Sequence, residues 1–426
     1  MRVANQTVSR NYLKHLETNY SNVYKSQNKI DSTHQYEFGS ENPINAAGEL
    51  RVRKAIANLE NYQYNLKTAD SIYSAAESSV MAISEIIQTT YEKCIEAANG
   101  TSDDVHTHAP DQLEMIAVNV EAYADEIARL MNLTVADRRI FGGINNDCKA
   151  FAIEDGRVIY NGVDVDTYND PTLFPNSRES YADIGLGMML NEDGRVDEQS
   201  AIALTFNGMD VTGCGKKETS PYINLDSIIT GNTYTFKLRV GSDIEKDITF
   251  TGAATNDDNV DAINKAIADA FDGNESIKIL KHGLIVNNLN SDSVNISDRT
   301  AGANKLEVEN KGDAYSNNII QSILDAAKII RTGNGEEIAR YADHIYSLQT
   351  KVSLTLANIG TQTKFIEFNQ TRITNNMTTL QERENDLYGT DFAAESTNLK
   401  NYDAIYSATL QMSAMVVPQS IFDFMS

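Results

Sequence analysis

Residues 352–387 read VSLTLANIGTQTKFIEFNQTRITNNMTTLQERENDL, and their apolar side chains recur at alternating intervals of four and three residues. The alternation continues through eleven positions without a slip, and eight of those eleven side chains are apolar. The eight are Val352, Leu356, Ile359, Ile366, Ile373, Met377, Leu380 and Leu387. Because heptad spacing places its members on one helix face, the stretch predicts a long helix that packs along its length. The first seven form the predicted core helix seam.

The first hundred residues show the same spacing. A first heptad row consists of Leu13, Leu16, Tyr20, Val23, Gln27 and Ile30. A second row consists of Leu66, Ala69, Tyr73, Ala76, Val80, Ile83, Ile87, Thr90 and Cys94. Asn42-Pro43 supplies a helix N-cap and a proline at the first helical position. The helix that begins there is expected to end on Gly100 in the left-handed conformation, and an antiparallel helix should begin near Pro110.

The middle of the chain changes character, with most of the glycines and short runs of alternating polarity. Strands are predicted over 234–240, 247–250, 277–280, 284–286 and 294–296, and one amphipathic helix over 259–271. A last helix is expected from Asp391 to about Val417. The predicted fold class is therefore mixed, with long α-helical coiled-coil or bundle domains from both chain ends and an inserted, β-rich α+β domain.

The predicted segments follow from this division. Residues 1–40 form an N-terminal assembly helix that is disordered in the monomer, and 388–426 form a C-terminal assembly helix. Residues 41–144 and 316–387 are the two halves of a helical core domain. Residues 145–315 are the inserted surface domain.

Composition excludes several functional classes. The net charge of −24 leaves no cationic surplus for binding nucleic acid or an anionic membrane surface. The first twenty residues lack the apolar core of a secretory signal, and no run of about 18 apolar residues predicts a membrane span. Three widely spaced cysteines fit neither a disulfide framework nor a zinc site. Composition alone favours a cytosolic protein.

The two chain ends are predicted to be assembly surfaces. Burying the row over 13–30 returns less free energy than ordering its backbone costs, so this helix needs a second apolar row to cover it. Packing within one chain also produces heptads, but their presence at both termini favours self-assembly. The predicted assembly seam consists of Leu13, Leu16, Tyr20, Val23, Ile30, Leu387, Phe392, Leu399, Tyr402, Ile405 and Met412.

Motifs for chemistry are weak. Residues 103–108, DDVHTH, contain possible metal ligands, but the pattern is typical of a solvated turn. Residues 213–217, GCGKK, lack the first glycine and the final Ser or Thr of a phosphate-binding loop. Gly185-Leu186-Gly187 lacks the third glycine of a dinucleotide site. We therefore predict no catalytic residue, no metal, no cofactor and no enzymatic activity.

Short motifs in a consistent order resemble the bacterial flagellin family. Those at the N-terminal end are residues 1–6 (MRVANQ), 41–43 (ENP), 96–101 (EAANGT) and 139–143 (RIFGG). Those at the C-terminal end are 357–360 (ANIG), 388–395 (YGTDFAAE) and 419–425 (QSIFDFM). The start, the Phe-Gly-Gly segment and the Asp-Phe finish favour the hook–filament junction branch. Residues 32–39, STHQYEFG, depart from the glycine- and lysine-rich segment that the family has before its asparagine-proline turn.

The resemblance implies a structural subunit that forms a ring or helical layer with itself and contacts other hook-associated proteins and flagellin. It also implies an export chaperone that binds the C-terminal helix. The chain would leave the cell through the flagellar type III export channel without a cleaved signal, so the expected location becomes extracellular. Two alternatives stay open: a filament flagellin, and an adhesin or enzyme carried in the inserted domain.

Overall fold

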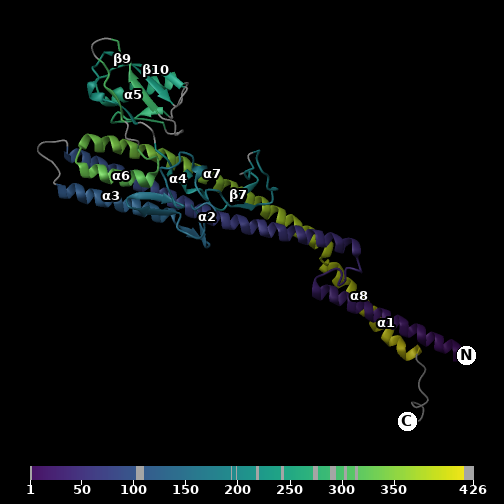
Figure 1. The fold of residues 1–426 in the computed structure, drawn as a ribbon. Helices are drawn as coiled ribbons and strands as arrows, with labels where there is room; N and C mark the ends of the chain where they lie inside the picture. Colours follow the sequence, from purple (N-terminus) through teal and green to yellow (C-terminus); the bar gives the residue numbers. More distant parts are fainter. Residues whose placement is uncertain are drawn as a thin grey trace. The chain divides into compact units, whose positions relative to one another are not determined.

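The computed structural model describes residues 2–101, 110–192, 194–197, 199–216, 220–240, 244–271, 277–287, 294–301, 305–311 and 315–416 (Figure 1). The chain divides into two compact units. Met1–Tyr64 and Asn369–Ser426 form the terminal unit, and Asn65–Phe368 form the larger unit. Both divisions fall inside long helices, so each of these helices contributes residues to both units.

Helices form most of the described N-terminal and C-terminal parts of the chain. They are α1 (Arg2–Ser32), α2 (Pro43–Thr101), α3 (Pro110–Met131), α6 (Ile319–Thr332), α7 (Gly335–Tyr388) and α8 (Phe392–Val416), with the short α4 (Gly208–Thr212) and α5 (Asn256–Ala270) between them. The Asn42 side chain accepts a hydrogen bond from the Asn45 amide, and Asp391 accepts from the amides of Ala393 and Ala394. These N-caps confirm the predicted starts of α2 and α8.

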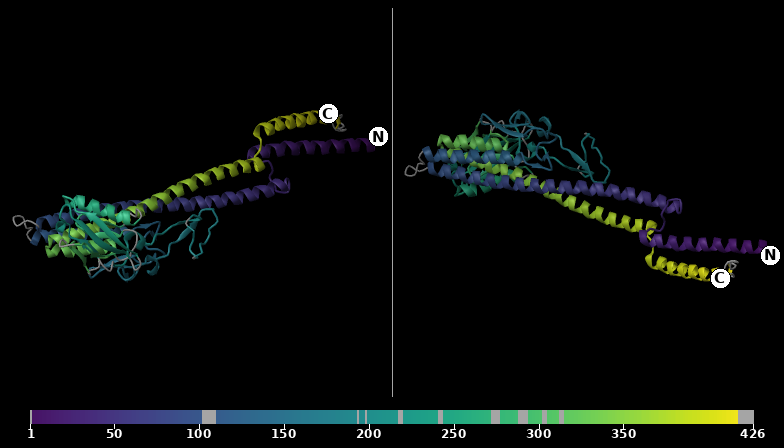
Figure 2. Two further views of the ribbon diagram at one scale, coloured as in Figure 1. Left: turned by 90° about the horizontal axis from the view of Figure 1, so that it is seen from above. Right: turned by 90° about the horizontal axis from the view of Figure 1, so that it is seen from below.

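The helical part of the larger unit consists of α3, α6 and the portions of α2 and α7 that belong to it (Figure 2). Every member of the predicted row from Leu66 to Cys94 is buried there. Tyr91 of α2 and Tyr346 of α7 stand 5.5 Å apart between ring centroids. Arg331 of α6 pairs with Glu114 and Glu121 of α3. The heptad prediction for this core is confirmed.

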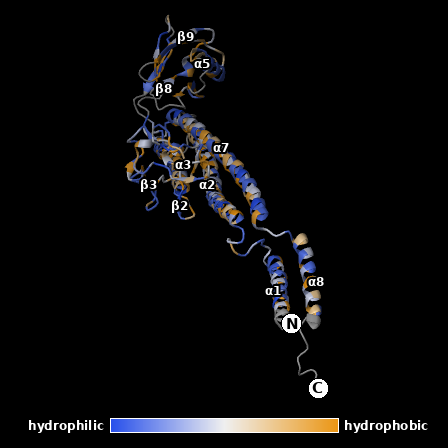
Figure 3. Cartoon of the chain, turned by 90° about the vertical axis from the view of Figure 1, so that its right-hand side faces the viewer, coloured by the Kyte–Doolittle hydropathy of each residue, from blue (hydrophilic) through white to orange (hydrophobic). Residues whose placement is uncertain are grey.

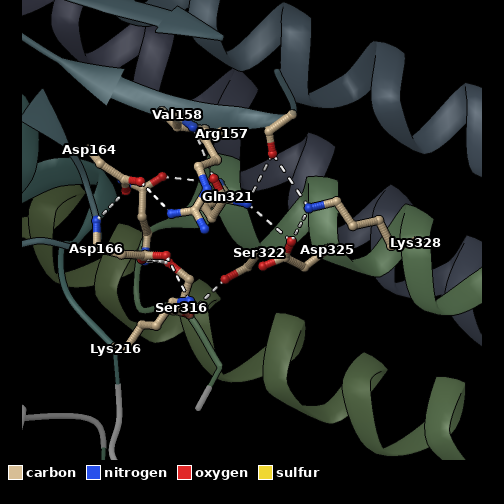
Figure 4. Close-up of polar contacts among 12 residues, drawn as sticks. Arg157, Val158, Asp164, Asp166, Lys216, Ser316, Gln321, Ser322, Asp325 and Lys328 are labelled. Atoms are coloured by element: carbon tan, nitrogen blue, oxygen red, sulfur yellow. Dashed lines mark hydrogen bonds and ion pairs between the residues drawn. The ribbon is translucent and has the colours of Figure 1, made fainter. Parts of the chain in front are cut away.

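Small antiparallel sheets lie between the helical segments. Nearest the helices are β1 (Thr134–Val135), β2 (Arg138–Arg139), β3 (Phe151–Glu154), β4 (Arg157–Tyr160), β5 (Val163–Asp164), β6 (Tyr181–Asp183) and β7 (Ala201–Ala203). The sheet β3-β4-β5 docks on the start of α6, where the Gln321 side chain accepts from the Val158 amide at 2.9 Å (Figure 4). Ser316 donates to Asp166 at 2.6 Å in the same cluster.

The inserted β-rich module is built around β9 (Thr233–Val240). Its other strands are β8 (Ser220–Ile223), β10 (Ile244–Thr251), β11 (Ile277–Ile279), β12 (Ile285–Asn287), β13 (Val294–Asp298) and β14 (Val308–Lys311). Strand β9 pairs with β10 and β13, and its alternate side chains Tyr234, Phe236 and Leu238 are buried against Ile263 of α5. The strands predicted in this region are confirmed.

Two sequence predictions need correction. Helix α2 continues through Gly100 to Thr101, so Gly100 does not end it. Helix α5 begins at Asn256, before the predicted 259, because Thr255 caps it by accepting from the Asp258 amide. In addition, α6 is a separate helix for which the sequence analysis predicts no bounds. The chain breaks between α6 and α7 at Gly333, whose φ of 69° suits glycine, and its amide bonds the Ile330 carbonyl.

Candidate assembly surface

Helices α1 and α8 lie side by side in the terminal unit (Figure 3). The Tyr12 hydroxyl donates to the Thr409 carbonyl at 2.8 Å, and the Asn19 side chain donates to the Thr409 hydroxyl at 2.9 Å. The Ser26 hydroxyl donates to a Glu395 carboxylate oxygen at 2.7 Å. Polar side chains therefore fix the register of this helix pair.

The row of α1 that faces α8 differs from the predicted row. It passes through Tyr12, Asn19 and Ser26 and shares Leu16, Val23 and Ile30 with the prediction; these last three side chains are half-buried. Leu13 and Tyr20 are exposed, although the Tyr20 ring lies 5.8 Å from that of Tyr406. Each of the two follows a contact residue by one position, which places it about 100° around the helix from the contact row.

The predicted assembly residues fall into two groups. Leu16, Val23, Ile30, Leu387, Leu399 and Tyr402 are half-buried. Leu13, Tyr20, Phe392, Ile405 and Met412 are exposed. The exposed group forms apolar surface beyond the contact row, to which Tyr24 of α1 and Leu410 of α8 also contribute. A terminal helix pair with this much uncovered apolar surface is suited to pack against further helices.

The predicted core helix seam is buried for most of its length. Val352, Ile359, Ile366 and Ile373 are buried, whereas Leu356, Met377 and Leu380 are half-buried. Ile366 belongs to the larger unit and Ile373 to the terminal unit. One face of α7 therefore provides buried residues to the larger unit before position 369 and to the terminal unit after it.

A cluster of aromatic and charged side chains, called the clasp below, joins the linker between α1 and α2 to the start of α2 and the end of α7. The Gln35 amide donates to the Tyr388 carbonyl at 2.7 Å, and the Thr390 amide donates to the Thr33 carbonyl at 3.0 Å. The rings of His34 and Tyr388 stack with 4.0 Å between centroids. The segment 32–39, in which the sequence departs from the flagellin pattern, thus forms the strand-like bridge that holds the start of α2 against the end of α7.

Tyr36 and Glu49 form the buried part of this clasp. The Tyr36 hydroxyl donates to a Glu49 carboxylate oxygen at 2.7 Å, and Arg53 pairs with Glu49 and Glu384, each at 2.8 Å. Burial, reinforced by the hydrogen bond to Glu49, raises the pKa of Tyr36 to about 12. Sequence periodicity did not predict this cluster, because its members come from three separated segments and from polar residue types.

Charge is divided very unequally between the two units. The terminal unit holds 11 Lys and Arg against 13 Asp and Glu, a net charge of −2. The larger unit holds the remaining 25 basic and 47 acidic residues, a net charge of −22. Close packing of copies through the terminal unit therefore meets little charge repulsion, whereas close packing through the larger unit meets much more.

The motifs that the sequence analysis considered and set aside lie in two kinds of place. The described part of the chain holds no group of three potential metal ligands, and the DDVHTH segment lies outside the described residues. Gly213 and Gly215 adopt positive φ angles in a turn next to Asn317 and Asn169, respectively. Among the described helices, none is long and apolar enough to cross a membrane.

Comparison with known proteins finds sequence similarity to flagellar proteins. Residues 3–146 match the family described as the bacterial flagellin N-terminal helical region. Over 121 residues the chain is 27% identical to flagellar hook-associated protein 3 of Escherichia coli (strain K12), covering 28% of this chain. The matched stretch spans 36% of that relative's length.

Solved structures of flagellar hook-associated proteins align over nearly their whole length, at low sequence identity. The hook-associated protein 3 of Legionella pneumophila aligns with a TM-score of 0.45 and 12% identity, covering 79% of this chain and 98% of that one. A putative flagellar hook-associated protein of Vibrio parahaemolyticus aligns with a TM-score of 0.47 and 11% identity, covering 82% and 100%. Over residues 3–146 the chain is therefore similar to the N-terminal helical region of bacterial flagellins, and over 121 residues it is similar to flagellar hook-associated protein 3.

Proposed function

We propose that this chain is a structural subunit of the bacterial flagellum that joins hook to filament. Copies assemble with one another through the terminal unit, and with other hook-associated proteins and flagellin at the two faces of the layer. The chain reaches this place by type III export without a cleaved signal, with a chaperone holding its C-terminal helix until assembly. The proposal includes no catalytic activity.

The observation that carries this proposal is the uncovered apolar surface of the terminal unit. Leu13 and Tyr20 project from α1 away from its contact row, and Phe392 and Ile405 are exposed on α8. Large apolar side chains that stay in water cost free energy, which neighbouring helices would recover by covering them. The near-neutral charge of the unit permits that approach. We further propose that α1 and α8 are fully ordered only when neighbouring copies cover them.

Paired substitutions on α1 test the assembly. Leu13→Ser with Tyr20→Ser removes exposed apolar surface, so we expect little change in the helix content of the monomer and loss of incorporation into flagella. Glu17→Ser, at an exposed position between them, is the matched control and should assemble normally. Normal motility and normal filament attachment in the double variant would contradict the proposal. Growth of purified chain into long filaments would instead favour a filament flagellin.

A further inference from the structure

A hairpin of the larger unit exposes a run of apolar side chains. It connects β6 to β7, and its described residues are 184–192, 194–197, 199 and 200. Met188, Met189 and Leu190 are consecutive and exposed, Met189 to 62% and Leu190 to 67%, and Leu186 is exposed beside them. Consecutive exposed apolar residues are unusual in a soluble domain without a binding role, and methionine adapts well to a partner surface.

Hydrogen bonds among the described residues of the hairpin order the backbone around Met189. The Asn191 amide donates to the Arg195 carbonyl at 2.7 Å, and the Asp197 amide donates to the Met189 carbonyl at 2.9 Å. The Met189 amide donates to the Ser200 hydroxyl at 2.9 Å. The apolar side chains are therefore displayed by an ordered backbone.

A groove with acidic groups adjoins the base of the hairpin. Its volume is about 300 Å³, and Tyr181, Ala203 and Phe206 supply apolar walls. Glu179 and Asp210 also line it, and Asp210 is exposed. A partner that fits the hairpin and groove together must therefore present apolar side chains next to basic ones.

The start of α2 has these properties. Ile44 and Leu50 are exposed, Leu50 to 68%, and the side chains of Arg51 and Lys54 are exposed beside them. The spacing of residues 44, 47, 50, 51 and 54 places all five on one side of the helix. Both this surface and the hairpin are exposed in a single copy, so each is available to a second copy.

We propose that the hairpin of one copy docks on the start of α2 of the next copy. Met189 and Leu190 pack against Ile44 and Leu50, and the acidic groups beside the hairpin attract Arg51 and Lys54. The two surfaces differ, so the contact is heterologous and propagates from copy to copy into a ring or a helix. It lies outside the α1–α8 pair and adds a second contact to the proposed assembly.

Disulfide trapping between two separately purified full-length variants tests this contact. Both carry Cys148→Ser, which removes the exposed native thiol. One adds Met189→Cys and the other adds Leu50→Cys, and the mixture is oxidised with copper phenanthroline. We expect cross-linked dimers that contain one of each variant, at a yield several-fold above either variant alone. Replacing Met189→Cys by Met81→Cys, at another exposed methionine, should give no such product.

Sedimentation of the same samples separates this contact from the proposed assembly. If the samples sediment as assemblies but yield no mixed dimer, the docking contact is overturned and the proposed assembly is not. If the samples sediment as monomers and yield no mixed dimer, both the docking contact and self-assembly are contradicted. Dimers of Met189→Cys with itself as the main product overturn the heterologous arrangement.

A charge exchange provides an independent measurement. Arg51→Glu with Lys54→Glu in one copy should reduce the mixed-dimer yield several-fold, because like charges then face each other. Glu179→Lys with Asp210→Lys in the Met189→Cys copy should restore it. A yield that is unchanged by the first pair, or not restored by the second, overturns the charge pairing.

Discussion

Arg53 of α2 lies over the ring of Tyr388, the last residue of α7, with 5.1 Å between its guanidinium carbon and the ring centroid. The same guanidinium pairs with Glu49, whose side chain is buried, and with Glu384. One side chain thus joins two helices from opposite ends of the sequence.

Arg53→Ala should destabilise the terminal unit by about 1–2 kcal/mol, through loss of the cation–π contact and of the partner of a buried carboxylate. Chemical denaturation followed by circular dichroism measures the change. Arg51→Ala is the matched control, because the Arg51 side chain is exposed and bonds only a carbonyl of its own helix, that of Ala47, at 3.2 Å. Equal effects of the two substitutions would contradict this role of Arg53.

Tyr36→Phe should destabilise the same unit by about 1–3 kcal/mol at neutral pH, because Glu49 loses a buried donor. The pKa of Tyr36 in the folded chain, about 12, lies above its ordinary value of 10.0. Folding therefore favours the protonated phenol. This part of the stability is fully present below about pH 10 and is lost as the pH rises towards 12.

Denaturation of both proteins between pH 8 and 12 measures this effect. The difference in unfolding free energy between wild type and Tyr36→Phe should stay constant to about pH 10 and shrink above it. A constant difference across the whole range would show that Tyr36 ionises as in the unfolded chain.

Asp343→Ala should loosen the attachment of the inserted module. Asp343 of α7 is 2% exposed and accepts from both the backbone amide and the ring Nδ1 of His282, at 2.7 and 2.8 Å. Losing these bonds should cost about 2–3 kcal/mol and speed amide hydrogen exchange in residues 280–284. Asp261→Ala, at an exposed position of α5, should leave that exchange unchanged. Exchange at 280–284 that does not respond to Asp343→Ala would argue against the attachment.

Thiol labelling should distinguish the three cysteines. Burial raises the pKa of Cys94 to about 12 and that of Cys214 to about 11, whereas Cys148 is exposed. Because the thiolate is the reactive form, iodoacetamide should label Cys148 first in the folded chain and all three after denaturation. Mass spectrometry of tryptic peptides reads the sites. Rapid labelling of Cys94 in the folded chain would contradict its place in the core.

Sequence periodicity predicted the parts of the fold in which burial and the apolar pattern coincide. The row from Leu66 to Cys94 is such a case, because neighbouring helices cover it throughout. On α1 the pattern selected Leu13 and Tyr20, whereas side-chain hydrogen bonds from Asn19 and Ser26 fix the face that meets α8. The spacing of apolar residues does not predict hydrogen bonds between polar side chains.

The clasp and α6 could not be predicted for other reasons. Tyr388 reaches Tyr36 from more than three hundred residues away in the sequence, so no local pattern joins the two. Helix α6 is separated from α7 only by Gly333 and Asn334, so the sequence gives little sign of a boundary between the two helices. A break of two residues is too short to stand out in a helical sequence.

The unequal division of charge makes salt act on one part of each copy. Fields between exposed charges reach about 10 Å at 0.1 M salt and about 30 Å at 0.01 M. Lowering the salt concentration would therefore increase the repulsion between the larger units of neighbouring copies. It would have little effect on contacts between the near-neutral terminal units. In any assembly of such subunits, the larger units would repel one another more strongly in fresh water than in brine.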